Sequence, residues 1–396
     1  MTDTKSSKLV ALAFAGALAF AGHAAQAADP YDIHAILSLT GGASFLGKAE
    51  QQSLQFLEKS ANETGGIQGR AVRFVFHDDQ SSPQTAVQLA SQVVAMKPAV
   101  EIGANLVAMC NAMVPLMQNG PVMYCLSPGI HPTAGSYAFT SSVSTIDLSK
   151  ALLRYFRLRG WTRIALMTST DASGQDAERG INGNLELPEN KGIKLVAREH
   201  FNPTDVSVAA QIENIKAAQP QAFIAWSTGA PIGTIFKAIT QAGLDVPMGT
   251  TDGNMTFAQM TQYAAFLPKQ LYIPAAQWAM HSTDMKRDRR VEAAQERFVA
   301  AYRAAGLEPD VAAALAWDPG SVVIDALRKL GPGATAPQVR EYLSKLKDYA
   351  GVDGIYDYTR TPQRGLDVED AVVTLWTPEK RRWLPVSQPG GMSLAN

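Results

Sequence analysis

A glycine-rich loop near the start of the chain has the spacing of a phosphate-binding motif. Gly42, Gly47 and Lys48 match G-x-x-x-x-G-K, and the apolar run 33–40 before them is typical of a buried strand. A nucleotide-binding loop continues with Ser or Thr, whose hydroxyl binds magnesium, but this chain has Ala49. A small anion can still bind at such a loop, because N–H groups at a helix N-terminus favour negative charge. The alternative is a turn that uses glycines for steric reasons only.

The usual signatures of catalysis are absent from the sequence. It contains no G-x-S-x-G, H-E-x-x-H or C-x-x-C, and its six histidines are scattered. His77, Asp78 and Asp79 could be imagined as metal ligands, but HDDQSSP is more typical of a strand that ends in a turn. The segment 331–336 has the form G-x-G-x-x-A, yet it follows a helical pattern and not the strand of a dinucleotide loop. The motifs therefore predict no cofactor, no metal and no enzyme activity.

The first thirty residues have the pattern of a secretory signal peptide. Lys5 and Lys8 precede an apolar run over 9–22, and Ala25 and Ala27 form an A-x-A cleavage site. We predict cleavage after Ala27 and localisation in the periplasm, where an ATPase would lack its nucleotide. The alternative is a buried N-terminal helix.

Apolar runs, net charge and cysteine content limit the classes of protein and partner that the sequence fits. No later run reaches eighteen apolar residues, which predicts a soluble mature protein. The net charge of −1, with charges interspersed, indicates no nucleic-acid partner. Cys110 and Cys125 could form one disulfide in an oxidising compartment, and the sequence leaves open whether their geometry permits it.

Short β-rich runs alternate with longer amphipathic ones along the chain. Candidate strands lie at 33–40, 72–77, 100–104 and 122–127, and again, after a polar break at 137–144, at 163–168, 194–198, 222–226 and 247–251. A further β-like run at 271–276 precedes three helical stretches within 287–345, and 368–376 is the last candidate strand. This order predicts an α/β fold of two similar lobes. Each lobe has a mainly parallel sheet flanked by helices, and three hinge crossings lie near residues 140, 275 and 370.

Several segments carry a family likeness. SLTGGASFLG, NETGGIQGRAVRFVFHDDQSSPQTAVQLASQVV and NGPVMYCLSPGIHP resemble, in order and spacing, the N-terminal lobe of periplasmic leucine/isoleucine/valine-binding proteins. WTRIALMTSTDASGQDA and AFIAWSTGAPIGTIFKAITQAGLDVPMGTTDG are similar, more loosely, to the C-terminal lobe of these type I substrate-binding components of ABC transporters. The likeness covers most of residues 31–376.

The resemblance implies an organisation and a function. It implies a monomer that closes on a small ligand, does no chemistry and presents the ligand to the membrane permease of an ABC importer. The signal peptide would be 1–27, the N-terminal lobe 28–141 and 277–366, and the C-terminal lobe 142–276 and 367–396.

Family positions also suggest the ligand-binding residues. The resemblance places a ligand carboxylate near Cys110, Asn111 and the turn 127–131, and a ligand ammonium near Asp252. The full set of candidates is Thr40, Phe45, Leu46, Cys110, Asn111, Ser127, Gly129, His131, Asp171, Ser173, Trp226, Thr228, Thr251 and Asp252.

Departures from the family pattern bear on the ligand. Cys110 stands where the family has Ser, and Ser173 and Gly229 stand where it often has aromatic residues, which predicts a wider pocket. Our hypothesis is a hydrophobic carboxylate larger than leucine, such as an aromatic acid, with a branched-chain-type amino acid as the alternative. Asp252 discriminates between them, because a buried carboxylate without a cation is costly.

Two other functions stay open. The first is a secreted α/β enzyme acting on a small carboxylate, with Asp171, Asp252 or His131 as acid/base residues, since fold alone does not fix function. The second is a ligand-sensing subunit of a receptor.

Overall fold

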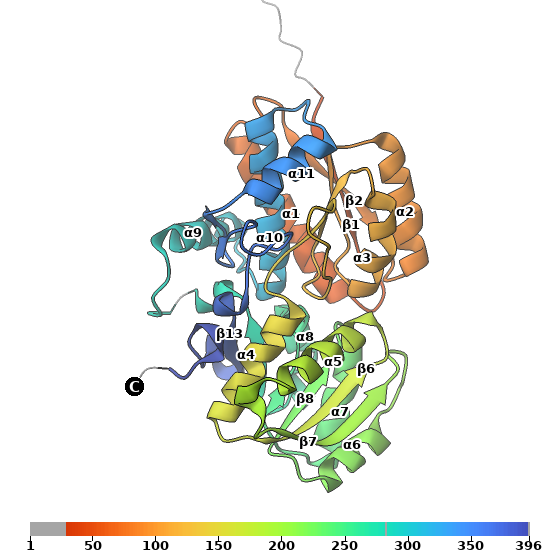
Figure 1. The fold of residues 1–396 in the computed structure, drawn as a ribbon, viewed down its shortest axis with the longest axis vertical. Helices are drawn as coiled ribbons and strands as arrows, with labels where there is room; N and C mark the ends of the chain where they lie inside the picture. The colour runs from red at the N-terminus through yellow and green to blue at the C-terminus, as the bar shows by residue number, and fades with distance from the viewer. Residues whose placement is uncertain (1–28, 282, 395–396) are drawn as a thin grey trace, which may run out of the picture.

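Two α/β lobes lie one above the other (Figure 1). The computed structural model describes residues 29–281 and 283–394, so the predicted signal peptide lies outside the described residues. Each lobe is built on one sheet, and the predicted two-lobed α/β fold is confirmed. No helix in the described ranges is long and apolar enough to cross a membrane.

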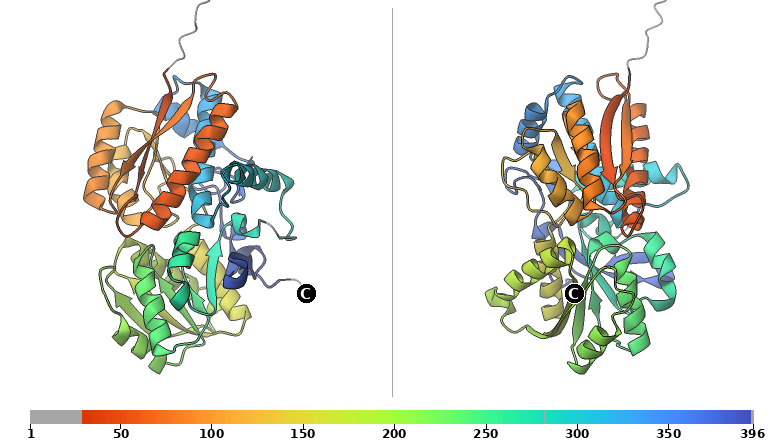
Figure 2. Two further views of the ribbon diagram at one scale, coloured as in Figure 1. Left: turned by 180° about the vertical axis from the view of Figure 1, so that it is seen from behind. Right: turned by 90° about the vertical axis from the view of Figure 1, so that its right-hand side faces the viewer.

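The first lobe contains a parallel five-stranded sheet in the order β2-β1-β3-β4-β5. Its strands are β1 (Tyr31–Leu37), β2 (Val72–Asp78), β3 (Val100–Ile102), β4 (Val122–Cys125) and β5 (Ala138–Thr140). Its helices are α1 (Ser44–Glu63), α2 (Pro83–Met96) and α3 (Val107–Met113), followed much later by α9 (Arg289–Arg303), α10 (Val311–Leu330) and α11 (Ala336–Lys345). Figure 2 shows α10 beside α1, so a late segment completes this lobe.

The second lobe contains a seven-stranded sheet in the order β14-β13-β10-β9-β8-β6-β7. Its parallel strands are β6 (Arg163–Ser169), β7 (Lys194–Phe201), β8 (Ala222–Trp226), β9 (Met248–Gly249) and β10 (Leu271–Ala275). The last two, β13 (Val372–Thr377) and β14 (Arg382–Pro385), are antiparallel. Its helices are α4 (Thr145–Leu158), α5 (Ala172–Leu185), α6 (Ala209–Ala217), α7 (Pro231–Ala242) and α8 (Phe257–Gln262).

Helix ends follow local sequence rules. The Ser82 hydroxyl accepts the Thr85 N–H at the start of α2, as its position before Pro83 predicts. Gly243 ends α7 in the left-handed region, with φ of 64°. Ser82 therefore marks where the loop before α2 ends, and Gly243 marks where the loop after α7 begins.

The chain crosses between the lobes three times, as predicted. The crossings follow β5, β10 and the short strand β12 (Ile355–Tyr356). Arg364, on the third crossing, is 5% exposed and donates hydrogen bonds to the carbonyls of Pro128, Ile130, Ser141 and Ser142. Burial lowers the pKa of this guanidinium to about 10, which leaves it cationic at neutral pH.

The lobe boundaries predicted from the sequence, 28–141 with 277–366 and 142–276 with 367–396, stay a proposal.

Buried carboxyl groups gather beside the third crossing. Asp318 of α10 accepts the N–H groups of Val352 and Asp353 at 2.8 and 2.9 Å, and the Tyr356 hydroxyl at 3.0 Å. Asp353 is buried too, but neither of its carboxyl oxygens has a hydrogen-bond partner among the described residues. Burial raises the pKa of Asp353 well above its usual value, and the nearby charge of Asp318 raises it further.

The Asp353→Asn variant should be more stable than the wild type, and more so at pH 8 than at pH 5. Because the folded-state pKa is raised, the stability that this acid contributes is full below its unfolded pKa and is lost as the pH rises. Removing the charge should recover on the order of 1–3 kcal/mol at pH 8. Thermal unfolding at the two pH values measures this, with the exposed Asp284→Asn as control. An equal effect at both pH values would contradict the assignment.

Candidate ligand-binding site

A cavity of about 20 Å³ lies between the two lobes, where loops leave the carboxyl ends of strands in both sheets. It is lined by Leu46, Asn105, Leu106, Val107, Ser127, Pro128, Gly129, Thr145, Ser173, Trp226, Thr228, Thr251, Asp252, Gly253 and Leu315. A volume of this size holds about one water molecule. The structure therefore has its lobes closed on each other, and a larger molecule enters only when they separate.

Eight of the fourteen predicted residues line this cavity. They are Leu46, Ser127, Gly129, Ser173, Trp226, Thr228, Thr251 and Asp252. They come from both lobes: Leu46 and Ser173 lie in the first turns of α1 and α5, Trp226 ends β8, and the others lie in loops or in a short helical turn. The structure thus brings together most of the residues that the family resemblance suggested, and their role in ligand binding stays a prediction.

Two predicted residues of the first lobe lie at its surface and one lies in its core. The Thr40 hydroxyl donates to Asp78 at 2.7 Å in an exposed turn. Asn111 is exposed on α3. Cys110 is fully buried and joined to Cys125, so it has no thiol to offer a ligand.

Three further predicted residues support the contact between the lobes or a helix end. Phe45 packs edge-on against Tyr263 of the second lobe, with ring centroids 6.1 Å apart. His131 Nε2 lies 2.9 Å from Oδ1 of the buried Asp176 on α5. Asp171 accepts the Gly174 N–H at 3.0 Å as the N-cap of α5. None of the three lines the cavity.

Sequence reasoning missed the cavity residues next to β3. The family comparison pointed to residues 110 and 111, but α3 already begins at Val107 and the residue facing the cavity is Asn105. Its side-chain amide donates to the buried Glu50 at 2.8 Å, which fixes its orientation. Asn105 could have been found as a polar residue directly after a strand. Leu315 of α10 had no such signal, because it comes from a helix far along the chain.

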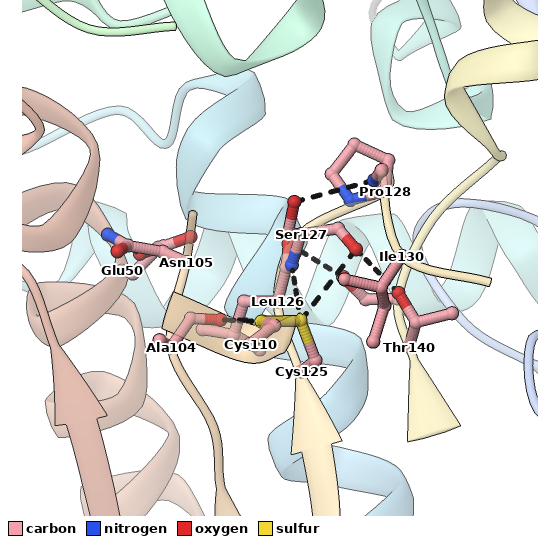
Figure 3. Close-up of a disulfide and its surroundings, with 12 residues drawn as sticks. Glu50, Ala104, Asn105, Cys110, Cys125, Leu126, Ser127, Pro128, Ile130 and Thr140 are labelled. Carbon is pink, nitrogen blue, oxygen red and sulfur yellow. Dashed lines mark hydrogen bonds between the residues drawn. A yellow bond between two sulfur atoms is a disulfide. The ribbon is translucent and has the colours of Figure 1, made fainter. Parts of the chain in front are cut away.

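A disulfide supports two walls of the cavity. Cys110 lies on α3, whose start supplies Leu106 and Val107, and Cys125 ends β4 two residues before Ser127. The Ser127 N–H also points to the Cys125 sulfur at 3.3 Å (Figure 3). The question that the sequence left open is answered: the two cysteines are bonded. The bond ties the start of α3 to the turn that carries Ser127.

Residues that carry hydroxyl groups line the cavity from both lobes. In the second lobe, the Ser173 and Thr228 hydroxyls lie 3.0 Å apart. In the first, the Ser127 hydroxyl accepts the Gly129 N–H at 3.4 Å. Because a hydroxyl both donates and accepts, these groups can exchange their mutual bonds for bonds to a ligand oxygen.

Among the residues that the structure describes, Asp252 is the one acidic side chain that lines the cavity. It is fully buried, and one carboxyl oxygen accepts the Thr251 hydroxyl at 3.0 Å while the other has no partner among the described residues. Burial raises its pKa to about 6, and the Thr251 hydroxyl offsets part of that rise. The free oxygen is therefore a ready acceptor for a cationic group.

The opening glycine loop makes a contact between the lobes. The Gly42 carbonyl accepts the Ala230 N–H at 2.8 Å, and a Cβ on Gly229 would lie 2.5 Å from the same carbonyl. Gly229 also has φ of 87°, in the left-handed region. The prediction that Gly229 widens the pocket is wrong, because this glycine is outside the cavity and lets the two loops approach.

Comparison with known proteins agrees with this geometry. Residues 30–373 match the family of periplasmic binding proteins, and the chain belongs to that family. It is 23% identical, over 64% of its length and 69% of the relative's, to the leucine-, isoleucine-, valine-, threonine- and alanine-binding protein of Pseudomonas aeruginosa. The resemblance drawn from the sequence is thereby confirmed.

Solved structures show the same fold. An extracellular ligand-binding receptor of Rhodopseudomonas palustris matches with a TM-score of 0.80 and 21% identity, over 90% of this chain and 99% of that one. A solute-binding protein of an R. palustris ABC transporter, solved with benzoate, matches with a TM-score of 0.73 and 18% identity, over 93% and 98%. At these identities, the two structures show that the fold is shared.

Removing the disulfide should destabilise the protein. In the Cys110→Ser/Cys125→Ser double variant, we expect the free energy of unfolding to fall by about 2–4 kcal/mol, because the unfolded chain gains the freedom of an open loop. Denaturant unfolding measures the change. The wild type in reductant should behave like the variant, and the variant should not respond to reductant. Equal unfolding midpoints for oxidised wild type and variant would show that the bond carries no stability.

Gly229→Ala should shift the lobes toward an open arrangement, because its methyl group collides with the Gly42 carbonyl. Gly160→Ala is a matched control: its φ of 78° imposes similar backbone strain, but nothing lies within 4 Å of the new Cβ. Small-angle scattering should give a larger radius of gyration for Gly229→Ala only. Identical scattering from the two variants would refute a role for this contact in closure.

Proposed function

We propose that this protein captures a small hydrophobic carboxylate by closing its two lobes and delivers it to the membrane permease of an ABC importer. The observation that carries the proposal is one cavity where apolar side chains and hydroxyl groups of both lobes meet around a buried carboxyl group. Membership of the periplasmic binding protein family supports the class of function. We further propose that the protein acts as a monomer and reaches the periplasm through the signal peptide.

Each part of the cavity suits a part of such a ligand. Ser127 and the N–H groups of its turn are suited to the carboxylate, since hydrogen bonds to an ionised group are the stronger kind. Leu46, Trp226 and Leu315 offer apolar surface for the side chain of the ligand. Because these residues belong to both lobes, a hydrophobic amino acid would contact the full set only when the lobes close around it, less tightly than in this structure, where the cavity holds about one water molecule.

Asp252 favours a ligand that also carries an amine. Its unpartnered oxygen would gain an ammonium group as a partner, whereas an amine-free acid would leave that oxygen buried and unpaired. A hydrophobic amino acid therefore suits the cavity better than an aromatic acid without an amine. The named specificity of the P. aeruginosa relative is in line with this, while the benzoate-bound R. palustris protein represents the amine-free alternative.

Matched ligands separate these alternatives. Leucine and phenylalanine should raise the thermal unfolding midpoint, because they bind the folded form only. Their amine-free analogues, 4-methylpentanoate and 3-phenylpropanoate, should bind more weakly to the wild type. In Asp252→Asn, the affinity for the amino acids should fall at least about tenfold, on the order of 1.4 kcal/mol, while that for the analogues should not fall.

The exposed Asp245→Asn serves as the control for this series. Equal affinity of wild type and Asp252→Asn for both amino acids would remove Asp252 from the site. Recovery of the ligand unchanged after incubation distinguishes capture from turnover by an enzyme.

A further inference from the structure

A second cavity, of about 150 Å³, lies away from the one between the strand ends and shares no lining residue with it. Its walls come from α8, the segment after β10, the end of α9, the start of α10, and β14. An apolar protein cavity of this volume is large enough to bind benzene. This cavity can thus accommodate a single six-membered ring.

Aromatic side chains form two of its walls. Phe257 stacks on Trp383, with ring centroids 5.1 Å apart and planes 28° from parallel. Trp278 stacks on His281, with centroids 4.0 Å apart. Burial lowers the pKa of His281 to about 4, with Arg382 and Arg287 adding to the effect, so this ring is neutral at pH 7. The walls therefore present uncharged aromatic surface, which favours contact with another ring.

Two exposed arginines also line this cavity. Arg303 comes from the end of α9 and Arg382 from β14, and neither lies within 4.0 Å of a carboxylate among the described residues.

Two acidic residues line the cavity as well. Both carboxyl oxygens of Asp310 already accept backbone hydrogen bonds, from the N–H groups of Phe257 and Ala313 at 3.1 and 3.0 Å. Glu308 is exposed. Two unpaired guanidinium groups thus lie beside an aromatic cavity.

We propose that this cavity is a second small-molecule site, which takes an aromatic carboxylate with a single ring. The ring would lie against Trp383 and Trp278, and the carboxylate would accept hydrogen bonds from the Arg303 and Arg382 guanidinium groups. Arginine is suited to this role, because its planar fork binds both oxygens of a carboxylate and also stacks on aromatic rings. The proposal does not depend on which ligand the cavity between the strand ends receives.

The site would link the two lobes. Trp383 and Arg382 belong to the sheet of the second lobe, whereas Arg303 ends α9, which contacts α1 of the first. Val311 lines this cavity, and Leu315, one turn further along α10, lines the other. An occupant that contacts both lobes favours the arrangement in which those contacts exist together.

Fluorine NMR can observe the two cavities separately. The protein is labelled with 5-fluorotryptophan, the resonances are assigned with single Trp→Phe variants, and benzoate is titrated. We expect saturable shifts at Trp278 and Trp383, whatever happens at Trp226 in the other cavity. The Arg303→Gln/Arg382→Gln double variant should bind benzoate at least tenfold more weakly at this site, and Arg381→Gln, an exposed neighbour that does not line the cavity, should match the wild type.

Two comparisons make the result decisive. Benzyl alcohol, which keeps the ring but lacks the charge, should shift the same two resonances with lower affinity than benzoate. The ligand-free spectrum of the double variant should match that of the wild type, which shows that the arginines are not needed for folding. The proposal is overturned if Trp278 and Trp383 do not respond to benzoate, or if the double variant binds benzoate as tightly as the wild type.

Discussion

The buried guanidinium of Arg364 is the constraint on which the arrangement of the lobes depends. It lies on the third crossing, yet its hydrogen bonds go to the first crossing, at Ser141 and Ser142, and to the turn that holds Pro128 and Ile130. A cation can remain buried only if its donors are satisfied, so these carbonyls must keep their positions around it. The hinge and one wall of the cavity are thereby held by the same side chain.

The walls of the cavity are supported within the first lobe, and a separate set of contacts joins the two lobes. Within the first lobe, the disulfide and the Asn105–Glu50 hydrogen bond hold the walls in place. Between the lobes, the contacts include the hydrogen bond from Ala230 to the Gly42 carbonyl, the aromatic contact from Phe45, and packing of α3 on α5. Walls that are fixed within one lobe suit a protein whose lobes open and close around a solute.

The sequence predicts the lobes well, because alternating strand and helix patterns are local and repeat over many residues. It is weaker where long-range proximity decides. The Cys110–Cys125 bond needs two elements to meet in space, and Leu315 reaches the cavity from a helix that no motif marks. The strand β14 was not predicted, because a four-residue run after a turn carries little periodicity. Gly229 was misinterpreted, because its partner, the Gly42 carbonyl, lies in the other lobe.

The hydrogen bond between Gly42 and Ala230 has a consequence for how the lobes close. It joins two backbone groups, and a second bond between the lobes runs from the Phe257 N–H to the Asp310 carboxyl group, so both bonds use groups that are present whether or not a solute is bound. The folded chain can therefore close its lobes without a solute, and a bound solute increases the population of the closed form. A surface that forms only when the lobes close would therefore be present in empty as well as in occupied molecules.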